Sequence, residues 1–250
     1  MSWDSLPAQL QSFADELARQ PETAATANAL RAFHTKFVSL WRDEKKISAR
    51  DVPIPVPRNQ GLHPVGCTPV QAFLSFAFEL GDCDPGFPDL AVFQIRVESL
   101  LEIPSGTVEL QDHWRVDTDT YSNPRRERPE GAKQAKEPHP YYHFQRGGHA
   151  QDEFAGQPFF VPGKDLPTAQ AWKALGQGPS PRVAVIPMCP ILAIDFSIAE
   201  HNGLVWRRLR DTPEYATFIR ISQDRLWLPF FDAIADKRQR RLWLGPTLLG

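Results

Sequence analysis

The residues best suited to chemistry lie in one short stretch, from Pro138 to His149, which reads PHPYYHFQRGGH. It contains three histidines, two tyrosines, an arginine and a pair of glycines. Histidine titrates nearest to neutral pH among the side chains and is a common metal ligand. This composition therefore predicts a site for proton transfer, metal binding or ligand binding.

An earlier segment offers a partner for this stretch. Residues 107–117 predict a half-buried strand, because apolar and polar side chains alternate along them. The apolar face carries Trp114 and Val116, with Asp112 as its polar intruder. The opposite face carries Glu109, His113, Arg115 and Asp117.

Residues 139–145 predict a second strand, in which Tyr141, His143 and Gln145 share one face. If the two strands pair, their polar faces form one surface with two histidines, two carboxylates and an arginine. The candidate catalytic residues are then His113, Arg115, Asp117 and His143. The Gly147-Gly148 pair permits a sharp turn that brings His149 back toward His143.

Three roles remain open for this surface. His143 and His149, with Asp117 or His113, can bind a divalent metal, although their spacing matches no standard zinc signature. Alternatively, the two strand histidines act as acid and base while Arg115 holds a phosphate, as in a hydrolase of phosphodiester or nucleotide bonds. Otherwise, these side chains are structural and bond to neighbouring loops. No cofactor beyond such a metal is predicted.

The common signatures of phosphate loops, dinucleotide folds and serine hydrolases are absent from the sequence. A binding role is predicted for Tyr141, Gln145 and Arg146 of the histidine-rich stretch. The same role is predicted for Trp243 and Leu248 of the apolar C-terminal tail, which must pack on its own domain or on a partner.

The first half of the chain predicts helices and extended segments. Apolar residues at helical spacing predict helices over residues 4–19 and 23–45, which form a hairpin. Prolines alternate with apolar residues over 51–57, which predicts a polyproline-like connector or a segment laid over the core. Residues 68–80 predict a buried helix, because Thr68 can cap it and Pro69 suits its first turn. Residues 90–101 favour a strand slightly over a helix.

The second half begins with a polar, proline-containing segment, residues 118–137, which predicts a long excursion between the two paired strands. Short strands are predicted near residues 157–161 and 182–186, with one helical turn around 169–175. Helices are predicted over residues 191–201, 213–221 and 224–236. Asp195 lies in the first of these between apolar residues, so it requires a partner, such as an arginine or a histidine of the sheet.

The overall composition predicts a folded α+β protein. Hydrophobic residues make up 42% of the 250, which is enough for a core, and 24 prolines against 15 glycines argue against a helical bundle. We expect a small antiparallel sheet of about four strands, flanked by the N-terminal helical hairpin and C-terminal helices. The expected division is a helical segment over residues 1–50 and a main α+β domain over 58–250.

The order of the central features resembles uncharacterised bacterial proteins encoded in mobile and anti-phage defence islands. Those features are Arg115-x-Asp117 on a strand, His139-Pro140-x-x-His143 with Gly147-Gly148, and a proline-led helix. The resemblance implies a bacterial cytoplasmic component that works beside other protein subunits.

The net charge is −2, so no global field favours nucleic acid or an anionic membrane, and no apolar run is long enough to span one. The leading hypothesis is a non-enzymatic accessory or sensor subunit that acts through protein contacts. The alternative is the phosphodiester or nucleotide hydrolase, with nucleic acid or a nucleotide as partner, so whether the chain is an enzyme stays open.

Overall fold

A computed structural model describes residues 3–55, 67–80, 88–103, 106–118, 140–146, 172–175 and 183–236. The fold is α+β, as the sequence predicts. None of the helices within these ranges is both long and apolar enough to cross a membrane.

A seven-stranded sheet forms the centre of the molecule, with the order β1-β2-β3-β4-β5-β7 and with β6 paired to β4. The strands are β1 (Lys46–Ile54), β2 (Cys67–Leu80), β3 (Pro88–Ile103), β4 (Gly106–Thr118), β5 (Tyr142–Arg146), β6 (Trp172–Leu175) and β7 (Val183–Ala184). All pairings are antiparallel except that of β6 with β4. β2, β3 and β4 are much longer than the usual five or six residues.

The two faces of this sheet differ in chemistry because side chains alternate along each strand. One face carries the buried apolar residues, and its centre is the cross-strand row Phe76, Phe93, Val116 and Phe144. We call this the core face. The residues between them point the other way, onto what we call the outer face, where polar side chains are frequent.

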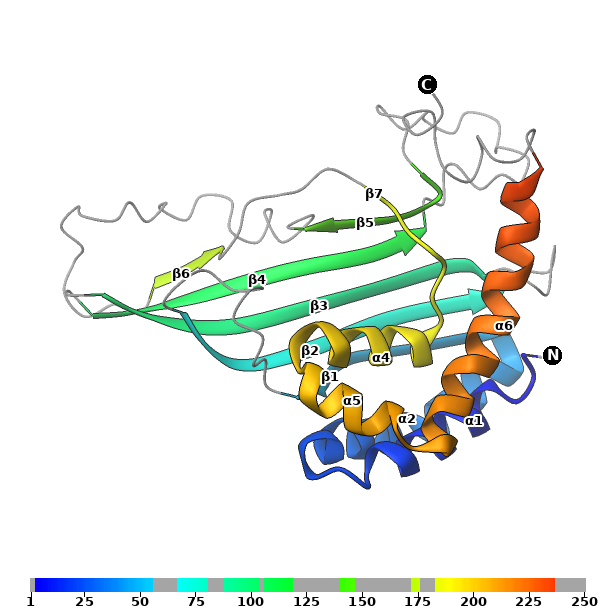
Figure 1. Cartoon of the computed structure of the whole chain (residues 1–250), viewed down its shortest axis with the longest axis horizontal. Coiled ribbons are helices and arrows are strands. Elements are labelled where there is room, and N and C mark those ends of the chain that lie inside the picture. The colour runs from blue at the N-terminus through cyan, green and yellow to red at the C-terminus, as the bar shows by residue number, and fades with distance from the viewer. Residues whose placement is uncertain are drawn as a thin grey trace.

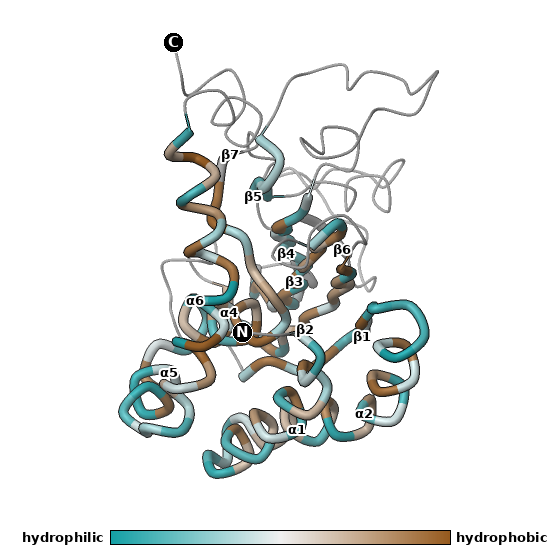
Figure 2. Tube along the Cα trace, turned by 90° about the vertical axis from the view of Figure 1, so that its right-hand side faces the viewer, coloured by the Kyte–Doolittle hydropathy of each residue, from teal (hydrophilic) through white to brown (hydrophobic). Residues whose placement is uncertain are grey.

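Helices gather on one side of the sheet and at one of its ends (Figures 1 and 2). They are α1 (Leu6–Leu17), α2 (Ala24–Glu44), α4 (Pro190–His201), α5 (Gly203–Arg210) and α6 (Pro213–Ala235), with a 3-10 turn at Pro21–Thr23. Phe37 and Trp41 of α2 contact Phe76 and Phe78 of β2. The N-terminal helices therefore share one hydrophobic core with the sheet.

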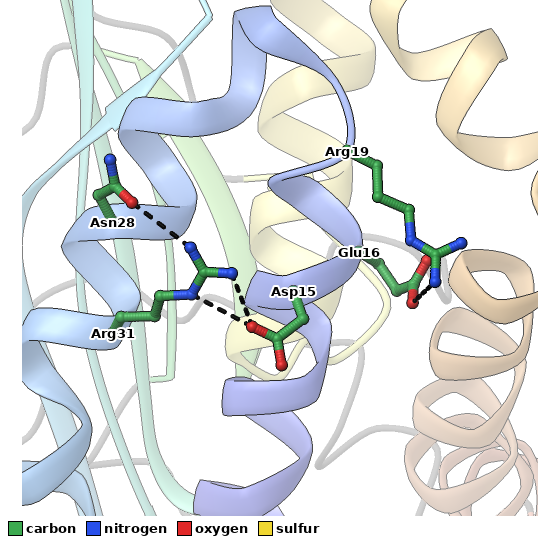
Figure 3. A network of polar contacts seen from close by, with 5 residues as sticks. All are labelled: Asp15, Glu16, Arg19, Asn28 and Arg31. Atoms are coloured by element: carbon green, nitrogen blue, oxygen red, sulfur yellow. Dashed lines mark hydrogen bonds and ion pairs between the residues drawn. The ribbon is translucent and has the colours of Figure 1, made fainter.

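The expected N-terminal hairpin is confirmed as α1 and α2. One ion pair joins the two helices, in which Arg31 of α2 reaches Asp15 of α1 at 2.7 Å; Arg19, just after α1, pairs with Glu16 at 3.1 Å (Figure 3). α2 ends at Lys45, whose left-handed backbone (φ 52°) turns the chain directly into β1.

The prediction of a helix over residues 68–80 is wrong, because this segment is β2. The buried residues Ala72, Leu74, Phe76 and Phe78 recur at every second position, which is a strand period. Intervening apolar residues such as Phe73 made the segment look apolar all round. Pro69 is accommodated where the register with β3 shifts, between Pro69 and Gln71.

The prediction of a polyproline-like connector over residues 51–57 is wrong for residues 51–54, which belong to β1, whereas residues 56 and 57 lie outside the described residues. Pro53 is tolerated because β1 is an edge strand, where a missing N–H breaks no central ladder. The Pro53 carbonyl instead accepts a hydrogen bond from Thr26 of α2 at 2.5 Å. The boundary expected between residues 50 and 58 thus begins inside a strand of the sheet.

The C-terminal half needs two smaller corrections. Residues 213–235 form one continuous helix, α6, although two were predicted there; Pro229 lies inside it. Residues 172–175 form β6, where a helical turn was expected. The helix over residues 191–201 and the short strand within 182–186 are confirmed as α4 and β7. The segments 118–137 and 157–161 lie outside the described residues, apart from Thr118, which ends β4.

Asp195 of α4 ties the three C-terminal helices together. Its carboxylate accepts hydrogen bonds from Trp206 (3.0 Å) and Arg210 (2.9 Å) of α5 and from Tyr215 of α6 (3.0 Å). The expected partner is thus an arginine, although it comes from a helix. Burial raises the pKa of the Asp195 carboxyl, while these donors act in the opposite direction.

We expect Asp195→Ala to lower the free energy of unfolding by about 3 kcal/mol or more, because it leaves Arg210 and the buried Tyr215 hydroxyl without their acceptor. Asp195→Asn should cost less, since it keeps an acceptor oxygen and burial disfavours the charged form. Glu22→Ala, which removes the exposed partner of Arg208, is the control and should cost at most about 1 kcal/mol. Urea unfolding measures the loss in free energy of unfolding for the three variants. A loss for Asp195→Ala no larger than that for Glu22→Ala would contradict the prediction.

Candidate functional site

The predicted pairing of the two polar strands is confirmed. β4 and β5 are antiparallel neighbours, with Asp117 opposite His143 and Arg115 opposite Gln145. Residues that face each other across a pair lie on the same side of a sheet. Arg115, Asp117, His143 and Gln145 therefore share the outer face.

Asp117, Arg115 and His143 form a compact cluster there, which we call the Asp117 cluster. Asp117 Oδ1 lies 2.6 Å from His143 Nε2, and Asp117 Oδ2 contacts Arg115 Nε. Asp117 and His143 are only 6% and 3% exposed. One buried carboxylate therefore serves two basic side chains, and each of its oxygens faces one of them.

Both ring nitrogens of His143 have acceptors. Nδ1 lies 3.2 Å from the carbonyl oxygen of Pro140, which can only accept, so Nδ1 carries a proton. Nε2 lies 2.6 Å from Oδ1 of the Asp117 carboxylate. Both ring nitrogens of His143 therefore face oxygen atoms, one of Asp117 on β4 and one of Pro140 before β5.

His113 is part of a different contact. Its Nδ1 lies 3.1 Å from Nε2 of Gln94 on β3, so the amide donates and the ring accepts. The strand register places His143 opposite Asp117, four residues along β4 from His113. Four residues of strand span about 13 Å. The structure thus does not place the two histidines side by side, as a shared acid–base mechanism requires.

Arg146 has a role on the other face of the sheet. It lies opposite Trp114 of β4, on the core face. Burial raises the pKa of the Asp112 carboxyl, and the positive charge of Arg146 acts in the opposite direction. Asp112 is the predicted polar intruder, and Arg146 supplies the opposite charge it needs. The sequence analysis placed Arg146 among the ligand-binding residues. Its structural role follows from the strand register, which puts Arg146 opposite Trp114 and therefore on the same face as Asp112.

Two more of the predicted binding residues are buried. Tyr141 packs edge-on against Tyr142, with ring centroids 4.8 Å apart, and its hydroxyl donates to the backbone carbonyls of Pro88 and Asp89. Tyr142 in turn packs against Phe230 of α6. Gln145 is 9% exposed. These side chains fasten β5 to its neighbours.

The remaining predicted residues are not placed. His149, Trp243 and Leu248 lie outside the described residues, as does the side chain of Glu109. The metal site at His143 and His149 therefore stays a prediction. Within the described ranges, no group of three or more histidine, cysteine, aspartate or glutamate side chains could hold a metal ion.

A contact on the core face fixes the orientation of β4. The indole of Trp114 donates to Nε2 of His201 of α4 at 3.1 Å, and its ring packs edge-on against Phe196 at 5.2 Å. Because side chains alternate, anchoring Trp114 on the core face directs His113 and Arg115 outward. The helical layer thus sets the geometry of the outer face.

Comparison with known proteins identifies no relative. No protein-family model matches the chain, and no curated protein or solved structure matches it significantly.

We expect Asp117 and His143 to be energetically coupled. His143→Gln should lower the free energy of unfolding by about 3 kcal/mol, because it removes one of the two basic side chains that contact the buried Asp117 carboxylate. In a double-mutant cycle with Asp117→Asn, the coupling energy should be about 1–3 kcal/mol.

The matched control is another cross-strand pair of the same sheet, Lys46 and Glu79, whose charged groups are 3.9 Å apart and about a third exposed. The cycle of Lys46→Gln with Glu79→Gln should give a coupling below about 0.5 kcal/mol. Equal coupling energies in the two cycles, measured by urea unfolding, would show that the Asp117 cluster is not a structural unit.

Proposed function

We propose that this protein is a non-enzymatic accessory or sensor subunit of a multi-protein bacterial system. The observation that carries the proposal is the state of the Asp117 cluster. Asp117 and His143 are buried, contact each other and lie on two paired strands. Catalytic groups need access to a reacting atom and a proton position that can change.

The bacterial setting of the proposal comes from the resemblance of the central motifs to proteins of mobile and anti-phage defence islands. In that setting the protein is cytoplasmic and binds other subunits of the same system. Trp243 and Leu248, in the strongly apolar C-terminal sequence, are the residues we assign to those contacts.

A hydrolase of phosphodiester or nucleotide bonds is the second candidate, and one observation favours it. The side chain of Arg115 is 23% exposed while its Nε contacts Asp117. An arginine held by a carboxylate and still reached by solvent is a common way to present a cation to a phosphate. In this version the catalytic residues are His113, Arg115, Asp117 and His143.

A hydrolysis screen separates the two candidates. Wild-type protein and His143→Gln are incubated with a chromogenic phosphodiester, ATP, and single-stranded DNA and RNA, each with Mg²⁺, Mn²⁺ or Zn²⁺. We expect neither protein to give turnover above that of a protein-free control.

Circular dichroism at the assay temperature confirms that the variant is folded. Wild-type turnover that falls at least a hundredfold in the folded variant would establish the hydrolase instead. Turnover that is equal in both proteins would also contradict a non-enzymatic role, and would place the reaction away from His143.

A further inference from the structure

We infer that a groove beside the Asp117 cluster binds a small phosphorylated ligand, of the nucleoside monophosphate class. The groove lies between α2 and strands β1, β2 and β3, and its volume is about 560 Å³. Small-molecule sites commonly measure about 300–1,000 Å³. The inference rests on the proposed sensor function and names the ligand class that such a sensor would recognise.

Most of the strand residues that line the groove lie on the outer face of the sheet, while Ala49 and Phe76 belong to the core face. Ser48, Ala77 and Val92 lie opposite one another on β1, β2 and β3, and this row continues directly into Asp117 and His143. A parallel row runs from Ser75 through Gln94 to Arg115. Adjacent strands are about 4.8 Å apart, so a ligand on the floor lies next to the Asp117 cluster.

A β-bulge shapes one wall of the groove. Arg50 and Asp51 of β1 together oppose the single residue Ser75 of β2. Asp51 has the left-handed backbone conformation (φ 52°), which costs a residue other than glycine about 1 kcal/mol. Its N–H donates to Ser75 Oγ at 3.0 Å, which leaves the serine hydroxyl hydrogen as a donor. The bulge thus lies where Arg50 and Ser75 line the groove.

Two cations line the groove, and no lining residue among those described is acidic. Lys36 of α2 lies 6.0 Å above the ring of Phe33, and Arg50 is exposed at the bulge. The neighbouring carboxylate, Asp51, pairs with Arg96 instead, at 3.4 Å. By contrast, the other exposed cations of α1, α2 and the turn after α2 have carboxylate partners, namely Arg19, Arg31, Arg42 and Lys45.

These groups suit a phosphate joined to a flat ring. Arginine and lysine bind phosphate oxygens by charge and hydrogen bonds, and the hydroxyls of Ser48 and Ser75 add neutral donors. Phe33, whose ring stacks on Phe37 with centroids 5.8 Å apart, adds an aromatic side chain to the lining, and Ala77 and Val92 provide an apolar floor. Gln94 lines the groove, where its amide would bond to the edge of the ligand's ring. The same amide donates to His113, which links the groove to β4.

Isothermal titration calorimetry with AMP tests the inference, with inorganic phosphate and adenosine as the two partial probes. We expect wild type to bind AMP with a Kd on the order of 100 µM and each partial probe at least tenfold more weakly. Lys36→Gln with Arg50→Gln should weaken AMP at least tenfold. Ala77→Phe, which fills the floor without changing charge, should do the same.

The control is Arg207→Gln, which removes an exposed cation of α5 away from the groove and should leave the Kd unchanged. The absence of AMP binding at millimolar concentration, or binding that both groove variants retain, would overturn the inference. The titrated samples are then analysed for adenosine and phosphate. Binding with hydrolysis would keep the groove and reject the non-enzymatic function, whereas no binding and no hydrolysis would reject the groove alone.

Discussion

The register of three long antiparallel strands is the constraint on which the rest of the structure depends. β2, β3 and β4 pair over most of their length, so each side chain keeps its face across the whole sheet. A slip of one residue would move Phe76, Phe93 and Val116 into solvent and bury Gln94 and Arg115 among them. The hydrophobic core therefore enforces the geometry of the outer face.

This constraint explains which features the sequence could predict. The strands of residues 107–117 and 140–146 alternate polar and apolar residues, and their pairing brings Asp117 to His143 as expected. β2 carries the same alternation on its core face, but Phe73 and Ala77 on its outer face remove the contrast between the faces. Local pattern cannot distinguish such a strand from a buried helix when Thr68 and Pro69 imitate a helix start.

The features that the sequence could not predict depend on long-range pairing or backbone detail. The role of Arg146 as a counter-charge to Asp112 requires the β4–β5 register. The groove requires a bulge at Arg50 and Asp51, an edge strand that tolerates Pro53, and α2 lying beside β1 (Figure 2). None of these leaves a pattern within a window of ten residues, because each is a relation between segments that are distant in the chain.

The distribution of charge separates structural polar residues from those available to a ligand. Three buried carboxylates, those of Asp112, Asp117 and Asp195, each have a basic side chain nearby, namely Arg146, Arg115 with His143, and Arg210. A buried charge without such a neighbour would cost several kcal/mol, on the order of the whole stability of a domain. These pairings therefore stabilise the fold. Lys36 and Arg50 differ, because they lie together at a groove with no acidic lining residue among those described. Their charges are not needed to balance a buried group, and an anion from solution is the partner that such a pair would bind.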